Sequence, residues 1–262
     1  MPELPELANF KKYIDSTSLH QTVDKVVVTD DRILNNTTGN ELLDTLKGRQ
    51  FISTLQHGKY LFLQTDNHLE LMLHFGMTGN PVYYKNEEEK PDYARVIFQF
   101  DNGYHLAYNC MRMLGEVQLI EDHNEFIRQK ELGPDAMSGE IDLERFKELV
   151  RSSRGMIKTT LMDQGLMAGI GNECSEEILY QSGIHPKTKI KELSDDQLKT
   201  VYEQLHYVVE TKTEAGTGLE GLPDHWILKH REDGAECPKC GGTINRIEVG
   251  GRGTYICPEC QG

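Results

Sequence analysis

Three things are scarce in this 262-residue sequence: long apolar runs, a secretion signal and positive charge. No apolar stretch approaches the roughly 20 residues that a membrane-spanning helix needs. The first ten residues, MPELPELANF, contain neither a basic segment nor an apolar one, so they do not resemble a signal peptide. We therefore expect no membrane association and a cytoplasmic location, close to the nucleoid, or a nuclear location in a eukaryotic host.

The deficit of positive charge is large: 28 Lys and Arg stand against 42 Asp and Glu, which gives a formal net charge of -14. Such a balance is unfavourable for binding a polyanion such as DNA, because the overall field repels it. It does not exclude DNA binding, since Lys and Arg can line one groove while acidic residues gather elsewhere. A hydrophobic content of 37% is ordinary for a globular protein.

The first half of the chain is dominated by strand patterns. Residues 4–13 have the spacing of a helix, and the stretches that follow alternate between apolar and polar side chains. Asp101, Asn102 and Gly103 form a strong hairpin signal between two of these stretches. We expect an N-terminal helix followed by an antiparallel β-sandwich, with strands over residues 24–28, 60–65, 69–75, 94–101, 105–108 and 116–120.

After residue 134 the period of the apolar residues changes from two to about 3.6, which indicates helices. Ser194 and Gln197 have the spacing of a capping box that opens one of them. The fold class is therefore α+β. We expect three domains: residues 1–130 with the helix and the β-sandwich, 131–220 with the helices, and 221–262 as a small terminal module. The buried stripe of the capped helix should comprise Leu198, Val201, Tyr202, Leu205, Val208 and Val209.

Four of the six cysteines fall into two Cys-x-x-Cys pairs that are separated by sixteen residues. This spacing fits one zinc ion bound by four thiolates, and two disulfides are the alternative. A chain without a secretion signal favours zinc. We expect one structural zinc per chain, because four thiolates leave no open coordination position. The ligands are Cys237, Cys240, Cys257 and Cys260.

The segment between the two cysteine pairs has the pattern of a β-hairpin. Residues 244–249 and 254–256 flank a glycine-rich turn, with Arg252 near its tip. A module with so little core depends on its metal to fold. The other cysteines, Cys110 and Cys174, are expected to be small buried residues. Zinc hairpins occur in transcription, translation and repair proteins, so this module alone indicates only binding.

The N-terminus offers a candidate nucleophile. Met1 precedes the small residue Pro2, a context in which the methionine is removed, and removal would leave a free secondary amine. An N-terminal amine has a pKa near 8, and such an amine can attack a sugar carbon and form an iminium. The next residue, Glu3, could transfer protons to and from the sugar and the leaving base. An ordinary chain start is the alternative for this dipeptide taken alone.

The segment 2–7, PELPEL, together with the terminal zinc hairpin, resembles the formamidopyrimidine-DNA glycosylase and endonuclease VIII family. The resemblance spans nearly the whole chain. Residues 57–61, HGKYL, look like the hairpin with the family's catalytic lysine, here Lys59. Residues 73–79, LHFGMTG, look like the loop whose methionine enters the duplex. Residues 131–136 match the link between domains, and residues 169–186 look like the helix-two-turn-helix motif.

The resemblance implies roles for further residues. Met77, Arg112 and Leu114 would fill the space of the nucleotide that is turned out of the stack, with Arg112 facing the orphaned base. Phosphates would be held by Lys59, Lys158, Asn172 and Arg252. Met77 and Leu114 could instead be core residues, and Lys158 an ordinary surface lysine.

The sequence also departs from the family's pattern. In residues 111–114, MRML, one arginine remains of a common Pro-Arg-Arg-Phe run, and the aromatic residue is lost. Residues 173–175, ECS, replace the usual apolar-tyrosine-alanine, and Ala8 stands where a glutamate is frequent. Residues 216–230 are much shorter than the lid that closes over 8-oxoguanine, so base preference should differ.

We therefore expect a monomeric, bifunctional DNA glycosylase and abasic-site lyase that acts on damaged double-stranded DNA. Pro2 would attack C1′, Glu3 would handle protons, and elimination would cut the strand. Three alternatives remain open: endonuclease VIII-like specificity for oxidised pyrimidines or bulkier lesions, a non-catalytic protein that binds damaged DNA, and a zinc-ribbon transcription or translation factor.

Overall fold

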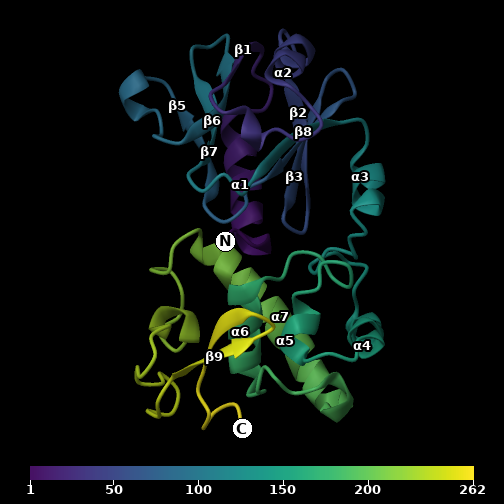
Figure 1. Ribbon diagram of the computed structural model, residues 1–262, viewed down its shortest axis with the longest axis vertical. Helices are drawn as coiled ribbons and strands as arrows, with labels where there is room; N and C mark the ends of the chain where they lie inside the picture. The colour runs from purple at the N-terminus through teal and green to yellow at the C-terminus, as the bar shows by residue number, and fades with distance from the viewer. The chain divides into compact units, whose positions relative to one another are not determined.

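The computed structural model describes residues 1–262 (Figure 1), and its contacts divide the chain into two compact units. Unit 1 comprises Met1–Pro2 and Glu6–Glu131. Unit 2 comprises Glu3–Pro5 and Leu132–Gly262. The short segment 3–5 therefore belongs to the second unit, although it lies at the start of the chain.

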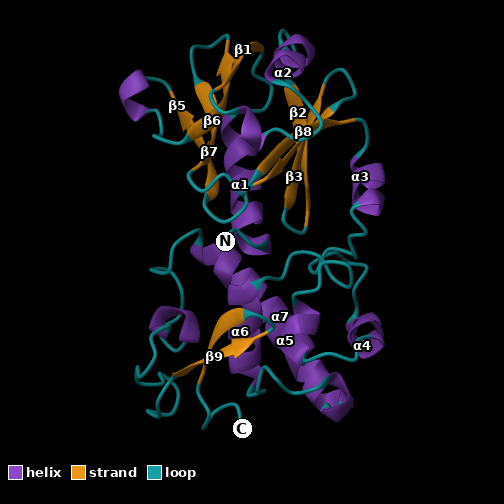
Figure 2. Cartoon of the chain, in the orientation of Figure 1, coloured by secondary structure: helices purple, strands orange, loops and turns teal.

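Unit 1 contains two four-stranded antiparallel sheets, drawn in orange in Figure 2. The first sheet has the order β1-β6-β7-β5, with β1 (Val23–Val28), β6 (Ala94–Phe100), β7 (His105–Cys110) and β5 (Gly79–Tyr84). The second has the order β2-β3-β4-β8, with β2 (Phe51–His57), β3 (Tyr60–Thr65), β4 (Glu70–His74) and β8 (Glu116–Ile120). These elements confirm the expected antiparallel β-sandwich.

Two strands, β2 and β5, were not predicted, and both lie at sheet edges. In β2 only Phe51 is buried, so the strand lacks the alternation that marks a half-buried strand. In β5 the residue Pro81 cannot donate a hydrogen bond, and proline is tolerated in sheets mainly on edge strands. Edge position thus explains why the sequence pattern is weak in both.

The helix α1 (Leu4–Thr17) lies between the two sheets of unit 1 (Figure 1). Its residues Leu7, Phe10 and Ile14 are buried in the sandwich core. Tyr13 Oη accepts a 2.8 Å hydrogen bond from the backbone N–H of Tyr83 on the edge strand β5. The remaining helical elements of unit 1 are α2 (Gly39–Leu46), α3 (His123–Gln129), η1 (Asp31–Ile33) and η2 (Glu87–Glu89).

Unit 2 is helical apart from one hairpin. Its helices are α4 (Leu143–Ser152), α5 (Ile157–Leu161), α6 (Asn172–Ser182) and α7 (Asp195–Ala215), with the short turns η3 (Ile190–Glu192) and η4 (Ile227–His230). The capping box that opens α7 is confirmed: Ser194 Oγ accepts from the Gln197 backbone N–H, and Gln197 Oε1 accepts from that of Ser194. The predicted stripe of α7 faces the core, with Tyr202 half-buried.

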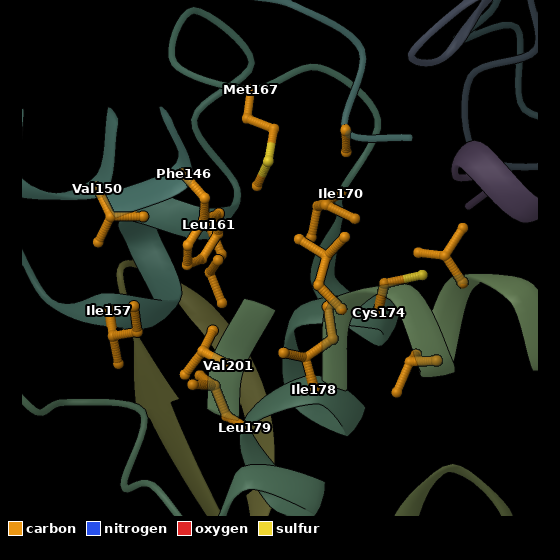
Figure 3. Packing of buried hydrophobic residues seen from close by; sticks show 14 of the residues in the cluster. Phe146, Val150, Ile157, Leu161, Met167, Ile170, Cys174, Ile178, Leu179 and Val201 are labelled. Atoms are coloured by element: carbon orange, nitrogen blue, oxygen red, sulfur yellow. The ribbon is translucent and has the colours of Figure 1, made fainter. Parts of the chain in front are cut away.

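The core of unit 2 collects apolar side chains from all four helices and from the turn that precedes α6. Figure 3 shows several of them in contact, with Phe146 and Val150 from α4 near Leu161 from α5. Ile170 from the turn before α6, and Cys174 and Ile178 from α6 itself, line another side of this core. This packing fixes the first turn of α6, on which the candidate site depends.

The hairpin β9 (Asn245–Val249) and β10 (Arg252–Ile256) turns at Gly250 and Gly251, whose φ angles are +57° and +74°. Positive φ at both central residues is typical of a tight hairpin turn. Arg252 is the first residue of β10, close to the tip as predicted. Across the whole chain, the helices are too short or too polar to span a lipid bilayer.

Candidate active site and nucleic-acid interface

The side chain of Glu3 is buried in unit 2, with 1% of its surface exposed. Its Oε2 accepts hydrogen bonds from the backbone N–H of Gly171 at 2.8 Å and of Cys174 at 3.1 Å. Its Oε1 accepts from the backbone N–H of Glu173 at 2.9 Å. These groups lie at the start of α6, where unpaired N–H groups and the helix dipole favour a negative charge. The helix therefore holds the carboxylate of Glu3 in one place.

Two glycines make room for the N-terminal segment. Gly169 has a φ of +113°, and a side chain there would press on Leu4. A side chain at Gly171 would overlap the carboxyl group of Glu3. The backbone N–H of Leu4 also donates to the carbonyl of Gly169 at 3.1 Å. These two glycines thus serve to seat residues 3 and 4.

Pro2 is joined directly to the anchored Glu3 by a peptide bond. Met1 is 42% exposed, so the bond that must be cut to free the Pro2 nitrogen is attached to an accessible residue. A nucleophile and an acid-base group on neighbouring residues can act on the same sugar, because the peptide bond between the two residues keeps the two groups close together.

Lys59 lies in the two-residue turn between β2 and β3, after Gly58, whose φ is +55°. Its side chain is 9% exposed. Burial lowers the pKa of His74, and the nearby charge of Lys59 lowers it further. Lys59 is thus a largely buried cation on the second sheet of unit 1.

Met77 and Leu114 are exposed apolar residues on neighbouring loops of unit 1. They are 41% and 53% exposed, which sets them apart from the sandwich core. The backbone N–H of Arg112 donates to Thr78 Oγ1 at 3.1 Å, and this bond ties the two loops together. A side chain at Gly76 would collide with the backbone of Leu114. The structure therefore places Met77, Arg112 and Leu114 close together at the surface.

Asn172 and Arg252 lie beside each other in unit 2. Asn172 Nδ2 donates to the carbonyl of Gly253, the residue after Arg252, at 3.2 Å. Arg252 is exposed, whereas the buried Oδ1 of Asn172 has no protein partner. The tip of the β9–β10 hairpin thus meets the N-terminal end of α6, where Arg252 is exposed and Asn172 is half-buried.

The resemblance assigns Lys158 to a phosphate contact, and the structure shows what surrounds its side chain. Its side chain is completely buried, and its Nζ donates to Thr254 Oγ1 of β10 at 2.8 Å. Glu176 on α6 lies 3.6 Å from the same Nζ. Burial lowers the pKa of Lys158 to about 8, although Glu176 opposes this shift. In this structure Lys158 fastens the hairpin to the helices.

A group of charged residues that sequence reasoning missed extends this contact. Arg231 Nε lies 2.8 Å from Glu176 Oε1, and the two side chains form an ion pair. Arg231 also pairs with Glu173, which in turn pairs with Lys212 of α7. The one feature of the sequence that pointed to this group is Glu173, which stands where the family usually has an apolar residue.

The four predicted zinc ligands converge. Their sulfur atoms all lie within 4.8 Å of one another, and Cys237 and Cys257 are buried while Cys240 is exposed. Four thiolates at this spacing suit tetrahedral zinc, which they would enclose completely. Tyr180, Ile227 and Ile244 pack around the buried cysteines. The metal site therefore joins the hairpin to α6 and to η4.

Residues 216–230, the shortened segment, fold against the helices of unit 2. Trp226 is fully buried, and Lys229 pairs with Asp224 at 2.6 Å. The backbone N–H of Leu228 donates to Glu177 Oε2 at 3.0 Å. This segment is anchored along its second half.

Three family models match successive parts of the chain. A model described as "Formamidopyrimidine-DNA glycosylase N-terminal domain" matches residues 1–117. One described as "Formamidopyrimidine-DNA glycosylase H2TH domain" matches residues 132–221, and one described as "Zinc finger found in FPG and IleRS" matches residues 234–262.

Similar proteins span the full chain. A formamidopyrimidine-DNA glycosylase of Mycoplasma mobile is 29% identical over 272 residues, which cover 100% of this chain and 99% of the relative. One of Arabidopsis thaliana is 29% identical, with 100% and 71% covered. A solved complex of Lactococcus lactis Fpg with DNA containing an abasic site has a TM-score of 0.89 at 25% identity, covering 99% of both chains. MutM in complex with DNA containing carbocyclic 8-oxo-G has a TM-score of 0.89 at 25% identity, covering 100% of both chains.

Proposed function

The chain belongs to the formamidopyrimidine-DNA glycosylase family, and from this premise we propose that it removes an oxidised or ring-opened base from double-stranded DNA and cuts the strand at the abasic site. The observation that carries the proposal is the anchoring of Glu3 by three backbone N–H groups of the α6 turn. A protein that only binds damaged DNA has no need of a fixed carboxylate next to its N-terminal amine.

In the proposed reaction, the freed Pro2 nitrogen attacks C1′ of the damaged nucleotide, and the bond between C1′ and the base breaks. The base leaves with the bonding electrons and takes up a proton, while the sugar ring opens and the nitrogen forms an iminium with C1′. Loss of a proton from C2′ then expels the 3′ phosphate, and water releases the enzyme. Glu3 is the group that moves protons, because it is the carboxylate next to the nucleophile.

We propose that DNA binding is divided among the other predicted residues. Lys59, Asn172 and Arg252 would hold phosphates, which fix the position of the duplex. Met77, Arg112 and Leu114 would enter the space left by the extruded nucleotide, where exposed apolar side chains replace a stacked base. The buried Lys158 is better suited to hold the hairpin that carries Arg252.

Zinc would have a structural part in this scheme, since the four cysteines would surround it completely. We further propose three functional domains, residues 1–130, 131–220 and 221–262, a monomeric enzyme, and action wherever the DNA is kept, in the bacterial nucleoid or the nucleus.

Endonuclease VIII-like specificity is the second candidate. The segment 216–230 is short and anchored through the buried Trp226, which leaves little chain for a mobile lid over a purine. Oxidised pyrimidines are smaller and need less cover.

A cleavage assay tests the function. Wild-type protein should cut duplex DNA at an abasic site and at one or more oxidised bases. The Glu3→Gln variant should lose base excision by at least about 100-fold, the usual contribution of a positioned proton-transfer group. Wild-type protein that binds damaged DNA and cuts none of it would support the non-catalytic alternative.

A further inference from the structure

The carboxylate of Glu173, on the first turn of α6, lies between two cations. Its Oε2 accepts a hydrogen bond from Lys212 Nζ at 3.0 Å, and its Oε1 lies 3.4 Å from Arg231 Nη1. The Lys212 side chain is 3% exposed, whereas those of Glu173 and Arg231 are 30% and 27% exposed. The lysine thus supports the pair from inside, and the carboxylate and the guanidinium reach the surface.

Stability alone does not explain these charges. A buried ion pair must overcome the loss of hydration of both groups, and apolar residues of similar size often serve equally well. Burial by itself would raise the pKa of Glu173, but Lys212 above all, with smaller effects of the N-terminal ammonium and of Arg231, holds that pKa below its usual value. The carboxylate is therefore charged, fixed and still accessible, and it can accept more hydrogen bonds than these two cations supply.

The position of Glu173 beside Glu3 indicates which ligand its carboxylate would bind. The backbone N–H of Glu173 donates to Glu3 Oε1 at 2.9 Å, so the two residues are in direct contact. This inference rests on the proposed function: if Glu3 exchanges protons at the sugar and the leaving base, the extruded base must lie within hydrogen-bond reach of it. The edge of that base then lies next to the first turn of α6.

We propose that Glu173 and Arg231 select bases with a lactam edge, meaning a ring N–H next to a carbonyl. The carboxylate of Glu173 accepts the ring N–H, and the guanidinium of Arg231 donates to the neighbouring carbonyl oxygen. Lys212 fixes the orientation of the carboxylate. Oxidised uracil and thymine derivatives and guanine-derived lesions carry such an edge.

Cytosine-type and adenine-type lesions have the opposite pattern, a ring nitrogen lone pair next to an amino group. That lone pair would face the carboxylate of Glu173, and the amino group would face the guanidinium of Arg231. Both contacts are repulsive and leave polar groups unpaired, which is the strongest basis for rejecting a base.

A matched pair of substrates tests the proposal. The bases 5-hydroxyuracil and 5-hydroxycytosine differ only at the edge in question. Both are placed in the same duplex opposite thymine, where neither forms a Watson–Crick pair, because a paired base costs more to extrude than a mispaired one. The single-turnover rate of base excision is measured for each and divided by the rate of abasic-site cleavage by the same protein. Wild-type protein should prefer 5-hydroxyuracil by at least about tenfold, because 5-hydroxycytosine loses both hydrogen bonds to charged groups and leaves these groups unpaired.

The Glu173→Gln variant should reduce this preference to within about threefold, because an amide can rotate to offer either a donor or an acceptor. The matched control is Glu210→Gln, the same substitution at an exposed position of α7, which should keep the wild-type preference. A preference for 5-hydroxycytosine or none in the wild type, or an unchanged preference in Glu173→Gln, would overturn the proposal. If Glu173→Gln does not fold, the wild-type preference alone decides.

Abasic-site cleavage separates this inference from the proposed function. Wild-type protein that cuts abasic sites but excises both pyrimidines equally contradicts the lactam selection and leaves the enzyme activity standing. Wild-type protein that does not cut abasic sites contradicts the proposed function itself.

Discussion

The carboxylate of Glu3 fills the space that the missing side chain of Gly171 leaves open. A Cβ atom at position 171 would overlap the carboxyl group, and the backbone N–H of the same glycine donates to Glu3 Oε2 at 2.8 Å. One residue thus supplies both the room and a hydrogen bond for an acidic group that lies 168 positions away in the sequence.

The first prediction follows from this contact. Gly171→Ala should displace Glu3 and remove its hydrogen bonds, so that abasic-site cleavage falls by at least about 100-fold. The free energy of unfolding should fall by about 1–3 kcal/mol, because a buried carboxylate loses donors. Cleavage kinetics and urea denaturation measure the two effects. Gly139→Ala is the control, since a side chain there would meet open space. Equal activity of both variants would contradict the role of the contact.

The second prediction concerns the salt dependence of DNA binding. Each phosphate contact contributes about 0.9 to the slope of log affinity against log salt. Arg252→Gln should lower the slope by about that amount, since Arg252 is exposed at the hairpin tip. Lys158→Met should leave it unchanged, because its Nζ is buried against Thr254. Titrations at several salt concentrations give both slopes, and a lower slope in Lys158→Met would restore it as a direct phosphate contact.

Lys158 also illustrates what a sequence can and cannot reveal. The alternation of Val96, Phe98 and Phe100 predicts a strand, and Cys-x-x-Cys spacing predicts the metal site, because both depend on neighbours in the chain. The burial of Lys158 depends on Thr254, 96 residues away, and on Glu176. No local sequence pattern indicates such a contact, so a single lysine is interpreted as a surface residue.

The third prediction concerns the metal. Removal of zinc by a chelator should abolish DNA binding, because the hairpin that bears Arg252 loses its anchor, and added zinc should restore it. Cys257→Ser should contain less than one zinc per chain. Cys110→Ala should keep one, since Cys110 lies in the core of unit 1, outside the zinc site. Metal analysis by mass spectrometry measures both. Full DNA binding by the zinc-free protein would contradict a structural role for the metal.

The fourth prediction tests the exposed apolar loop. Met77→Ala should slow base excision by about tenfold, because extruding a nucleotide costs a few kcal/mol and the space it leaves must be filled. Its stability should change by less than about 0.5 kcal/mol, as expected for a surface substitution. Ile52→Ala, at a residue of unit 1 with similar exposure, is the control. Equal excision rates in the two variants would show that Met77 has no part in extrusion.

The candidate site could be predicted only in part, because some of its contacts join residues that are far apart in the sequence. Pro2 and Glu3 attract attention because they resemble a family segment, and their chemistry follows from residue type. The cradle for Glu3 at Gly171 joins residues that are 168 positions apart. The pairing of Glu173 with Lys212 and Arg231 joins α6 to α7 and to the residue after η4. Contacts of this kind arise from packing, which sequence periodicity does not encode.

The central claim is that the nitrogen of Pro2 is the nucleophile, and one measurement tests it most directly. Purified protein is mixed with abasic-site DNA and borohydride, which reduces an iminium to a stable bond, and the trapped peptide is sequenced by mass spectrometry. The account predicts a peptide that begins at Pro2, without Met1, and carries the sugar on the Pro2 nitrogen. In Pro2→Gly the N-terminal amine is primary, and we expect the adduct to form more slowly. Retention of Met1 in the active protein, or an adduct on a lysine such as Lys59, would contradict it.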